Sequence, residues 1–481
     1  QMCTAAVATI AELRAALSGN CPTAQLGGGS YLLMGGQHLQ VSRDWTIEAD
    51  GGAVLDAQLL SRAFYVKSGA TLTLRGVNVT NGRAEGPCAS HPDKLDRCEA
   101  NQGGCILVRS GSRLVVERGE LSHCEASTGG GLFLGDASSG ELTDTVVRNC
   151  SLRSTDCADD PTDSSGGVSC AGYDGGGLRV EVSSSLVLRR SAVVGCWATD
   201  DGGGATVKRD SRLELIDSVM EDCHAGDDGG GVQTHTSTVV LTRSAMRNCT
   251  AVQNGGALFL HVWSHLSTSA SEVVGCSGGG SGGGVCLWGG CTATMVDTRV
   301  AGCATTAEAP RDDPEGATWR GGGGLALLDG YSVRSPGKFD GGRGSIATLR
   351  RVSFDGNAAA FDASALLIDL HSAVLAGSSA SLRDSCDHPG VAAIASFGGA
   401  CGVEVHLDAA QPGGCAALAA GGQCEADALV TAPAPDAPPS PPPPQQSQVA
   451  CTVDDATASD PGLWCERCES CSGYCPGCDD E

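Results

Sequence analysis

Short apolar segments recur along the middle of the chain, and each begins directly after a cluster of glycines. From residue 175 onward the clusters start 27, 27, 26 and 27 residues apart. A polar turn and a second apolar segment follow each cluster, as at Ser185–Leu188 and Arg212–Leu215. Such a period predicts a solenoid, because a unit this short cannot bury its own core and must stack on its neighbours. The clusters start at Gly129, Gly175, Gly202, Gly229, Gly255 and Gly282.

Every unit ends with an apolar residue, two further residues and a cysteine, as in Val193 to Cys196. Strands of successive coils should pair in parallel about 4.8 Å apart, which gives about eleven or twelve coils and a rod of about 55 Å. A leucine-rich repeat is excluded because no L-x-x-L-x-L pattern recurs, and a propeller is excluded because its blades need about 40 residues or more. The repeat cysteines are Cys124, Cys150, Cys196, Cys223, Cys249, Cys276 and Cys303.

The first hundred residues lead into this repeat. Residues Thr9–Leu17 have the spacing of a helix with Thr9 as its N-cap, and such a helix would cover the open end of the first coil. Strands are expected at Tyr31–Leu33, Trp45–Glu48, Ala63–Val66 and Thr71–Leu74. The sequence therefore predicts an all-β fold, a right-handed parallel β-helix of about 26–27 residues per coil with an N-terminal capping helix and a cysteine-rich C-terminal tail.

Changes in composition divide the chain into three parts. Residues 1–430 are predicted to form the capped β-helix, residues 431–449 a semi-rigid proline-rich linker, and residues 450–481 a cysteine-rich module. The module contains the run Cys465-x2-Cys468-x2-Cys471-x3-Cys475-Pro, which matches the spacing of iron–sulfur ferredoxins. Clusters need reduced thiolates and an enclosing apolar fold, so disulfides are favoured over iron–sulfur or zinc binding.

Charge and cysteine content indicate where the chain acts. A net charge of −25 argues against nucleic acid and anionic membrane surfaces as partners, and no apolar run is long enough to insert into a membrane. The 26 cysteines and the three sequons at Asn78, Asn149 and Asn248 indicate an oxidising, secretory route. The start at Gln1 is interpreted as a mature N-terminus after signal removal, so we expect an extracellular or cell-surface protein with glycans at those asparagines.

Cysteines that are close in sequence should form disulfides, because short separations meet the required Cα distance. The expected loop pairs are Cys3–Cys21, Cys88–Cys98, Cys157–Cys170, Cys286–Cys291, Cys386–Cys401 and Cys415–Cys424. The tail cysteines Cys451, Cys465, Cys468, Cys471, Cys475 and Cys478 are expected to pair as well. Cys105 and the seven repeat cysteines remain. We expect most of them to be free, buried thiols stacked in a ladder, with bridges between adjacent coils as the alternative.

Two motifs resemble a known repeat. Gly255–Leu258 (Gly-Gly-Ala-Leu) and Phe354–Asn357 (Phe-Asp-Gly-Asn) resemble the polymorphic outer-membrane-protein repeat of chlamydial surface proteins. In seven other coils a cysteine stands where that family has asparagine. The resemblance implies a parallel β-helix used for adhesion and surface display.

Two further stretches resemble other extracellular proteins. Gly51–Asp56, Phe64–Leu74 and Val77–Gly82 are similar to the opening of pectin-lyase-like β-helices. The proline run at residues 437–446 resembles the hydroxyproline-rich glycoproteins of green-algal walls and flagellar hairs (mastigonemes). The β-helix resemblance covers about residues 30–410 and implies the fold without implying a function.

Acidic residues offer the main candidate chemistry. A polygalacturonase-like site would combine an Asp-Asp pair with Gly-His-Gly and Arg-x-Lys motifs, and neither of these two motifs occurs. The pairs Asp200–Asp201 and Asp227–Asp228 are therefore interpreted as turn residues before glycine. A stacked acidic edge would suit Ca²⁺, although solvent and salt could equally screen it. That edge would consist of Asp174, Asp201, Asp228 and Asn254.

These observations favour a structural or adhesive secreted glycoprotein, a subunit of a cell wall or flagellar hair, over an enzyme. Its expected partners are other extracellular assembly proteins, further copies of itself, or glycans. No catalytic, cofactor-binding or metal-binding residues are assigned, and calcium is left open. The alternative function is a polysaccharide lyase or glycoside hydrolase of the pectin-lyase-like superfamily.

Overall fold

The computed structural model describes residues 4–19, 21–85, 99–152, 174–306, 321–328, 344–359 and 365–368, and the backbone of 373–383, 394–396 and 400–407. All of these belong to one compact unit, residues 1–426. The proline-rich linker and the cysteine-rich module lie outside the described residues, so the predicted division of the chain stays a prediction.

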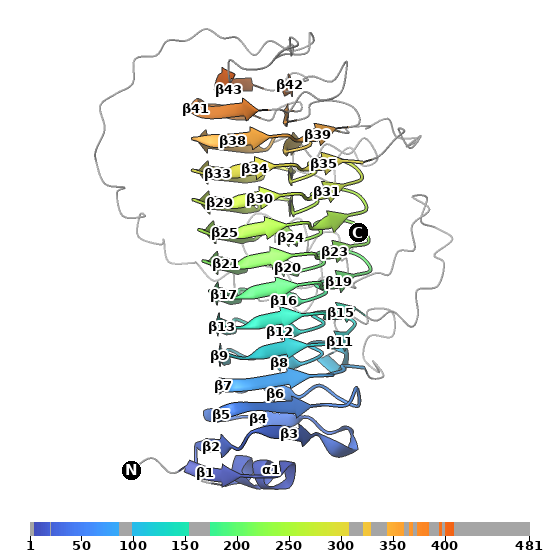
Figure 1. Cartoon of the computed structure of the whole chain (residues 1–481), viewed down its shortest axis with the longest axis vertical. Helices are drawn as coiled ribbons and strands as arrows, with labels where there is room; N and C mark the ends of the chain where they lie inside the picture. The colour runs from blue at the N-terminus through green and yellow to red at the C-terminus, as the bar shows by residue number, and fades with distance from the viewer. Residues whose placement is uncertain are drawn as a thin grey trace, which may run out of the picture. The chain divides into compact units, whose positions relative to one another are not determined.

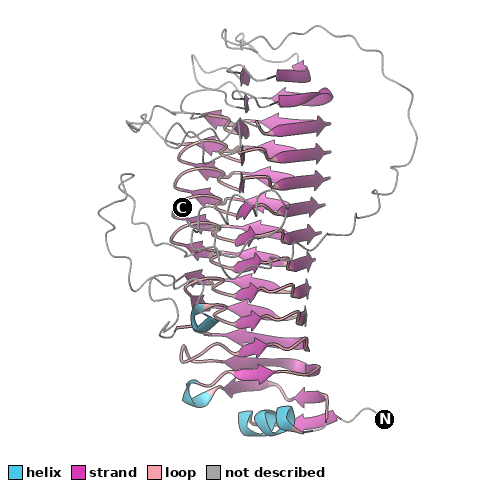
Figure 2. Ribbon diagram, turned by 180° about the vertical axis from the view of Figure 1, so that it is seen from behind, coloured by secondary structure: helices cyan, strands magenta, loops and turns pink. Residues whose placement is uncertain are grey.

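The described strands stack as successive coils and confirm the predicted right-handed parallel β-helix (Figures 1 and 2). Strands of neighbouring coils pair in parallel and form three sheets, which we call A, B and C. No described helix is long and apolar enough to cross a membrane.

Sheet A contributes two strands to most coils. It consists of β1 (Thr4–Val7), β2 (Thr23–Leu26), β3 (Gly29–Leu32), β5 (Trp45–Asp56), β7 (Thr71–Thr80), β9 (Arg113–Glu117), β10 (Glu120–Ser122), β13 (Ser139–Thr143), β14 (Val146–Arg148), β17 (Ser185–Arg189), β18 (Ala192–Val194), β21 (Arg212–Ile216), β22 (Val219–Glu221), β25 (Thr238–Thr242), β26 (Ala245–Arg247), β29 (His265–Ser269), β30 (Glu272–Val274), β33 (Thr292–Val296), β34 (Arg299–Ala301), β37 (Ile346–Arg350), β38 (Val352–Asp355), β41 (Ala373–Arg383) and β43 (Ala400–Leu407).

Sheets B and C contribute one strand each. Sheet B consists of β4 (Leu39–Val41), β6 (Phe64–Val66), β8 (Ile106–Val108), β12 (Leu132–Leu134), β16 (Leu178–Glu181), β20 (Ala205–Lys208), β24 (Val232–His235), β28 (Leu258–His261), β32 (Val285–Trp288), β36 (Leu325–Leu328), β40 (Leu366–Ile368) and β42 (Ile394–Ser396). Sheet C consists of β11 (Glu125–Ala126), β15 (Ser151–Leu152), β19 (Trp197–Ala198), β23 (His224–Ala225), β27 (Thr250–Ala251), β31 (Ser277–Gly278), β35 (Ala304–Thr305) and β39 (Ala358–Ala359).

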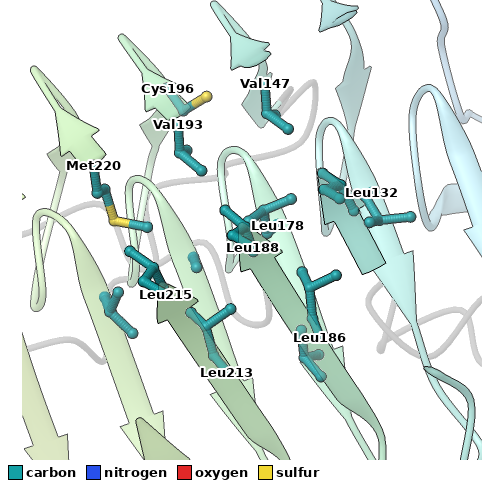
Figure 3. Close-up of a cluster of buried hydrophobic side chains, with 14 of the residues drawn as sticks. Leu132, Val147, Leu178, Leu186, Leu188, Val193, Cys196, Leu213, Leu215 and Met220 are labelled. Atoms are coloured by element: carbon teal, nitrogen blue, oxygen red, sulfur yellow. The ribbon is translucent and has the colours of Figure 1, made fainter. Parts of the chain in front are cut away.

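Alternation along each strand fills the interior of the coils. In β21, Leu213 and Leu215 point inward and are fully buried, whereas Arg212 is exposed. Each inward side chain lies beside its counterpart in the next coil, as Leu188 beside Leu215 and both near Met220 (Figure 3). The core is therefore one continuous column of apolar rows rather than a sphere.

A helix covers the N-terminal end of this column, as predicted. Helix α1 spans Ile10–Ser18, with Thr9 as its N-cap. The Thr9 hydroxyl accepts a hydrogen bond from the Glu12 amide, and the Glu12 carboxylate accepts one from the Thr9 amide, which completes a capping box. Leu13 is fully buried and belongs to the core, so the helix supplies the apolar neighbour that the first coil lacks.

The glycine clusters lie where the backbones of adjacent coils approach too closely for side chains. An ideal Cβ on Gly203 would lie 2.3 Å from the carbonyl oxygen of His224 and 2.5 Å from that of Gly230. Backbone oxygens cannot move away without breaking the hydrogen bonds between coils. The recurring glycines are thus required by stacking.

The repeat cysteines form the predicted ladder of buried thiols. In the described residues, the Cys249 thiol donates to the carbonyls of Arg247 at 3.4 Å and Met220 at 3.8 Å. Asn357 takes the place of cysteine one coil after Cys303: its Nδ2 donates to the Val300 carbonyl at 2.9 Å, and its Oδ1 accepts from the Cys303 amide at 2.9 Å. The free ladder cysteines are Cys150, Cys196, Cys223, Cys249, Cys276 and Cys303.

The structure corrects one member of this ladder. Cys124 is not free but forms a disulfide with Cys105, with a Cα–Cα distance of 5.4 Å. The reason is that Cys105 stands at the position that is glycine in most other coils. In the next coil that position is Gly131, and an ideal Cβ there would lie 3.1 Å from the sulfur of Cys150. A cysteine at this position is therefore within reach of the ladder.

The predicted Cys286–Cys291 disulfide is wrong, because both cysteines are free and buried. Cys286, in β32, lies in an outer cluster with Phe259, whereas Cys291, in the turn after β32, belongs to the inner core, so one thiol faces out of the coil and the other into it. Cys21 is disulfide-bonded, but its expected partner Cys3 lies outside the described residues. The other loop and tail pairs also involve residues outside the described ones or side chains that are not described, so they stay predictions.

The sequons have the expected orientation in the two coils where cysteine follows asparagine. Asn149 and Asn248 are exposed, and the neighbouring Cys150 and Cys249 are buried. Asn78, in β7, is half-buried. Glycosylation at these three positions stays a prediction.

Thiol counting tests the ladder. We expect no described free cysteine to react with a thiol reagent in the native protein, because all eight are buried. After denaturation without reductant, at least eight thiols should react per chain. Recovery of fewer than six would show that ladder cysteines are bridged, since Cys286 and Cys291 account for the other two.

Replacement of an inner glycine tests the stacking constraint. Gly203→Ala should lower the free energy of unfolding by about 2–3 kcal/mol, because the added methyl group overlaps two carbonyl oxygens. The matched control is Gly51→Ala, where the nearest atom to the new Cβ is 3.8 Å away. Thermal melts of both variants measure the difference, and equal melting temperatures would contradict the close approach.

Candidate functional site

The outer face of sheet B carries charged and aromatic side chains in the middle of an otherwise apolar sheet. In β16, Leu178 and Val180 point into the core, so Arg179 and Glu181 point outward. Parallel pairing aligns Glu181 with one residue in each following coil. We call this set the outer row of sheet B: Glu181, Lys208, His235, His261 and Trp288.

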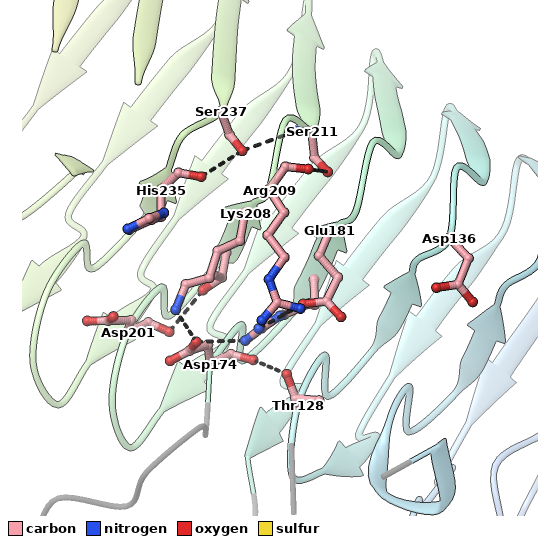
Figure 4. A network of polar contacts seen from close by, with 12 residues as sticks. Thr128, Asp136, Asp174, Glu181, Asp201, Lys208, Arg209, Ser211, His235 and Ser237 are labelled. Carbon is pink, nitrogen blue, oxygen red and sulfur yellow. Dashed lines mark hydrogen bonds and ion pairs between the residues drawn. The ribbon is translucent and has the colours of Figure 1, made fainter. Parts of the chain in front are cut away.

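A buried ion network lies at the N-terminal end of the outer row (Figure 4). The guanidinium of Arg179 contacts the carboxylates of Asp174 at 2.6 Å and Glu181 at 2.9 Å. The Nζ of Lys208 contacts the same oxygen of Asp174 at 2.5 Å. The side chains of Arg179, Asp174 and Glu181 are at most 8% exposed, so these charges interact in a medium that screens them weakly.

Carboxylates stack along the edge where each glycine cluster begins, as the sequence predicts. The amides of Gly175 and Gly202 donate to the carbonyls of Asp201 and Asp228, one coil further on. The Asp228 amide donates to Asp201 Oδ1 at 3.2 Å, and the Asn254 amide donates to Asp228 Oδ1 at 2.8 Å. We call Asp174, Asp200, Asp201, Asp227 and Asp228 the acidic edge.

The acidic edge contains two overlapping sets of three carboxylates. Oxygens of Asp174, Asp200 and Asp201 lie within 4.8 Å of one another, as do those of Asp201, Asp227 and Asp228. Asp201 belongs to both sets. Oxygen ligands at this spacing suit a hard divalent cation such as Ca²⁺, so these are the described residues that could hold one.

The environment drives the pKa values of these carboxyl groups apart. Burial raises the pKa of Asp174, but the charges of Lys208 and Arg179 outweigh it and hold that pKa below its ordinary value. Burial, together with the charge of Asp174, raises the pKa of Asp201 to about 7. Burial and the charge of Asp201 raise the pKa of Asp200 to about 9, and burial beside Asp227 raises that of Asp228 well above its usual range.

An ionised and a protonated carboxyl group therefore lie side by side near neutral pH. Asp174 is a carboxylate there, whereas Asp200 is a neutral acid and Asp201 is about half protonated. Two titratable groups whose environments push their pKa values apart are typical of acid–base catalysis. Asp174 contacts the outer row of sheet B through Lys208, and the charge of Lys208 also acts on Asp200 and Asp201.

Aromatic rings continue the site along the outer row. The ring of His261 stacks on Phe259 with centroids 5.6 Å apart and meets His235 edge-on at 5.2 Å. Phe259 also meets Trp288 edge-on at 6.3 Å. Burial and the nearby charge of His235 lower the pKa of His261 to about 3, so its ring is neutral.

A groove of about 900 Å³ opens at the bend of sheet A, away from these residues. Its walls carry alternating charges, and its arginines pair with carboxylates of an adjacent coil. Arg190 pairs with Asp144 at 2.7 Å and Arg243 with Asp217 at 2.6 Å, each in the preceding coil, whereas Arg247 and Arg299 pair with the following coil. The pairing lowers the pKa values of Asp144 and Asp217. With every one of these charges matched, the groove stabilises stacking and offers no acid–base pair.

The structure adds residues to the site that the sequence analysis did not single out. These added residues occupy outward positions of sheet B strands: Arg179, Glu181 and Lys208. Of the three, Arg179 and Lys208 place positive charges beside the acidic edge. The sequence does contain a signal for these residues: a charged residue inside the apolar segment after a glycine cluster, as in Gly-Gly-Leu-Arg-Val-Glu. The two Asp pairs, interpreted as turn residues, lie at this edge.

Comparison with known proteins gives fold neighbours but no family. No protein-family model matches the sequence, and a search of curated proteins finds no similar sequence. Among solved structures, tailspike protein 3 of bacteriophage CBA120 is 13% identical with a TM-score of 0.39, and the alignment covers 83% of this chain and 56% of the tailspike. This chain thus spans little more than half of that protein.

Two alginate lyases are similar to the same extent. Alginate lyase AlyF-OU02, in complex with G6, is 11% identical with a TM-score of 0.38, and the alignment covers 84% of this chain and 85% of that one. A PL6 alginate lyase in complex with a trisaccharide is 10% identical with a TM-score of 0.36, again over 84% and 85%. At these identities the likeness concerns the β-helix fold.

These findings contradict the expectation of a structural glycoprotein that is not an enzyme. The three structures described above are a phage tailspike and two alginate lyases, and they accord better with the alternative of a polysaccharide-active β-helix. The sequence-based expectation relied on the rigid rod, the proline-rich linker and the cysteine-rich end as well as on missing catalytic motifs. The structure brings ionisable groups together beside sheet B in the absence of those motifs.

The raised pKa values make stability depend on pH in a defined direction. Folded Asp200 and Asp201 keep protons that the unfolded chain releases above its ordinary pKa of about 4, so this stabilisation is lost as pH rises through about 7 and about 9. The melting temperature in EDTA should therefore fall between about pH 5 and about pH 9.

Asp201→Asn should flatten this pH dependence, because asparagine is neutral at every pH in the range. Asp222→Asn, at an exposed position of the same coil, is the matched control and should keep the slope. A melting temperature of the unmodified protein that rises over this range would contradict the assignment.

Proposed function

We propose that the chain is a polysaccharide-cleaving enzyme, a lyase or glycoside hydrolase, whose site is the outer face of sheet B beside the acidic edge. One observation carries the proposal: oxygens of Asp174, whose pKa is lowered, and Asp201, whose pKa is raised to about 7, lie within 4.8 Å of each other. A general acid works best when its pKa lies near the operating pH, as that of Asp201 does.

Hydrolysis would use this pair directly. Protonated Asp201 would donate its proton to the glycosidic oxygen as the bond to the sugar breaks. The carboxylate of Asp174 would stabilise the positive charge that develops on the ring. A water molecule would then form the new bond to that ring carbon and give up its proton to Asp201. The oxygens of Asp174 and Asp201 lie within 4.8 Å of each other, which is closer than the roughly 6.5 Å or more that inverting glycosidases leave for a water molecule. Asp174 acts as an electrostatic partner, because Arg179 and Lys208 already hold its oxygens.

Elimination is the alternative chemistry at the same place. A lyase removes the proton beside a uronate carboxylate and therefore needs a base and a means of neutralising that carboxylate. The ionised form of Asp201 would be that base, and Asp200 would protonate the departing glycosidic oxygen as the double bond forms in the sugar ring. Lys208, ion-paired with Asp174, would supply positive charge. The two sets of three carboxylates, which share Asp201, are the residues that would hold a divalent cation, and such a cation would neutralise the substrate's charge.

The geometry of the rod suits a polymeric substrate. The outer row places one side chain per coil, so side chains repeat about every 4.8 Å along the axis. A saccharide chain lying along this row would meet Lys208, His235 and His261 in succession. A polymer can therefore contact several coils while one bond lies at the acidic edge.

We also propose that the protein acts outside the cell, on glycans. The cysteine content and the three sequons support secretion, and an extracellular polysaccharide is the partner that fits this location. The finer resemblances, to the polymorphic outer-membrane-protein repeat and to green-algal proline-rich glycoproteins, remain proposals about ancestry.

Incubation of the purified full chain with pectin, polygalacturonate and alginate tests the function. Cleavage should release reducing ends, and a rise in ultraviolet absorbance from unsaturated uronate would identify elimination rather than hydrolysis. Asp201→Asn should lower the rate by about 10²- to 10⁴-fold, because it removes the proton donor.

The exposed Asp222→Asn variant should retain the rate of the unmodified protein. Absence of cleavage of every polymer, with and without Ca²⁺, would contradict the proposed function. Equal loss of activity in both variants would contradict the role of Asp201.

A further inference from the structure

Trp263 is an exposed indole at the border of the proposed site. It lies in the three-residue turn between β28 and β29, and 47% of its surface is accessible. Val262 and Trp263 both have positive φ, of 40° and 53°. This conformation is unfavourable for a β-branched residue such as valine, so the turn holds the indole outward at a conformational cost.

The next coil leaves room for this ring. Gly289 and Gly290 occupy the equivalent turn, where the preceding coils carry larger residues such as Arg209 and Asp210. An ideal Cβ on Gly290 would lie 2.8 Å from a ring carbon of Trp263. Any other residue at this position would displace the indole, so its orientation depends on the glycine.

Trp263 extends the aromatic part of the outer row. It follows His261 by two residues, and the rings of His261, Phe259 and Trp288 form a connected series. The outer row runs from Lys208 to His261 over two coils, or about 10 Å. The indole is therefore displaced along the axis from the acidic edge. A polymer with one bond at the acidic edge would place a neighbouring sugar beside the indole.

The chemistry of the surroundings favours a sugar ring over a protein partner. Protein interfaces use contiguous apolar patches, and the described neighbours of Trp263 in the turn and in β29 include buried Ser264 and half-buried His265. A pyranose ring presents polarised C–H groups on one face and hydroxyls at its rim. The electron-rich face of an indole attracts the C–H groups, while polar neighbours can meet the hydroxyls.

We infer that Trp263 is a stacking platform for one sugar residue of a bound polysaccharide, displaced along the rod from the bond that is cleaved. This inference rests on the proposed function and deepens it. Because the indole does not touch the reacting carboxyl groups, it should contribute to binding of the polymer and not to the chemical step. Trp263 is thus a positioning residue for long substrates.

The test compares Trp263→Ala with Trp197→Ala in the full chain. Trp197 is 40% exposed on sheet C and serves as the matched control. For the polymer cleaved by the unmodified protein, Trp263→Ala should raise KM by roughly 3- to 12-fold with kcat unchanged. Trp263→Phe should restore most of the affinity, and Trp197→Ala should match the unmodified protein.

Affinity electrophoresis through the same polymer separates binding from turnover. In an Asp201→Asn background, which should bind without cleaving, adding Trp263→Ala should reduce retardation. An unchanged KM and unchanged retardation, or a fall in kcat with KM unchanged, would overturn the role of Trp263 while leaving the proposed function standing. If the unmodified protein neither cleaves nor binds any polymer, the proposed function itself fails and the inference fails with it.

Discussion

Parallel stacking of coils is the constraint on which the rest of this structure depends. Backbone hydrogen bonds between coils place every residue beside its counterpart about 4.8 Å away, so a side chain is never alone but belongs to a row. Apolar rows form the core, and glycine rows permit close approach of backbones, as at Gly203 and Gly230. Thiol rows replace asparagine in the ladder that ends at Asn357. The side chains that a row contains determine whether the row stabilises the rod or forms a reactive site.

The two charged rows, at the bend of sheet A and at the acidic edge, differ most clearly in this respect. At the bend of sheet A, arginine and aspartate alternate along the axis, so Arg190 and Asp144 form an ion pair and the row is electrostatically balanced. At the acidic edge, aspartates follow one another, and like charges at this spacing repel. The pKa values of Asp200 and Asp201 rise as a result of burial and this repulsion. The balanced row contributes to structure, whereas the unbalanced row creates proton donors.

Much of the fold could be predicted from the sequence because rows leave a periodic signature. The glycine clusters, the repeat cysteines and the Thr9 cap all follow from local spacing, and the structure confirms them. The stacking of Asp201 on Asp228 was predicted from the same register. The Cys286–Cys291 pair failed because nearness in sequence does not reveal that one side chain faces out of the coil and the other into it.

The function was less accessible to sequence reasoning. The outward positions of Arg179 and Lys208 are visible from strand alternation, but their convergence on Asp174 depends on three-dimensional contacts between coils. Burial of the network, which separates the pKa values, cannot be read from composition. Absent motifs were therefore weak evidence against catalysis.

The most direct measurement is a crystal structure of the Asp201→Asn variant soaked with an oligosaccharide of the polymer that the unmodified protein cleaves. The saccharide should lie along the outer row of sheet B, with one glycosidic oxygen within hydrogen-bonding distance of residue 201. A saccharide bound in the sheet A groove between Asp144 and Asp297, or along sheet C, would contradict the assignment of the site.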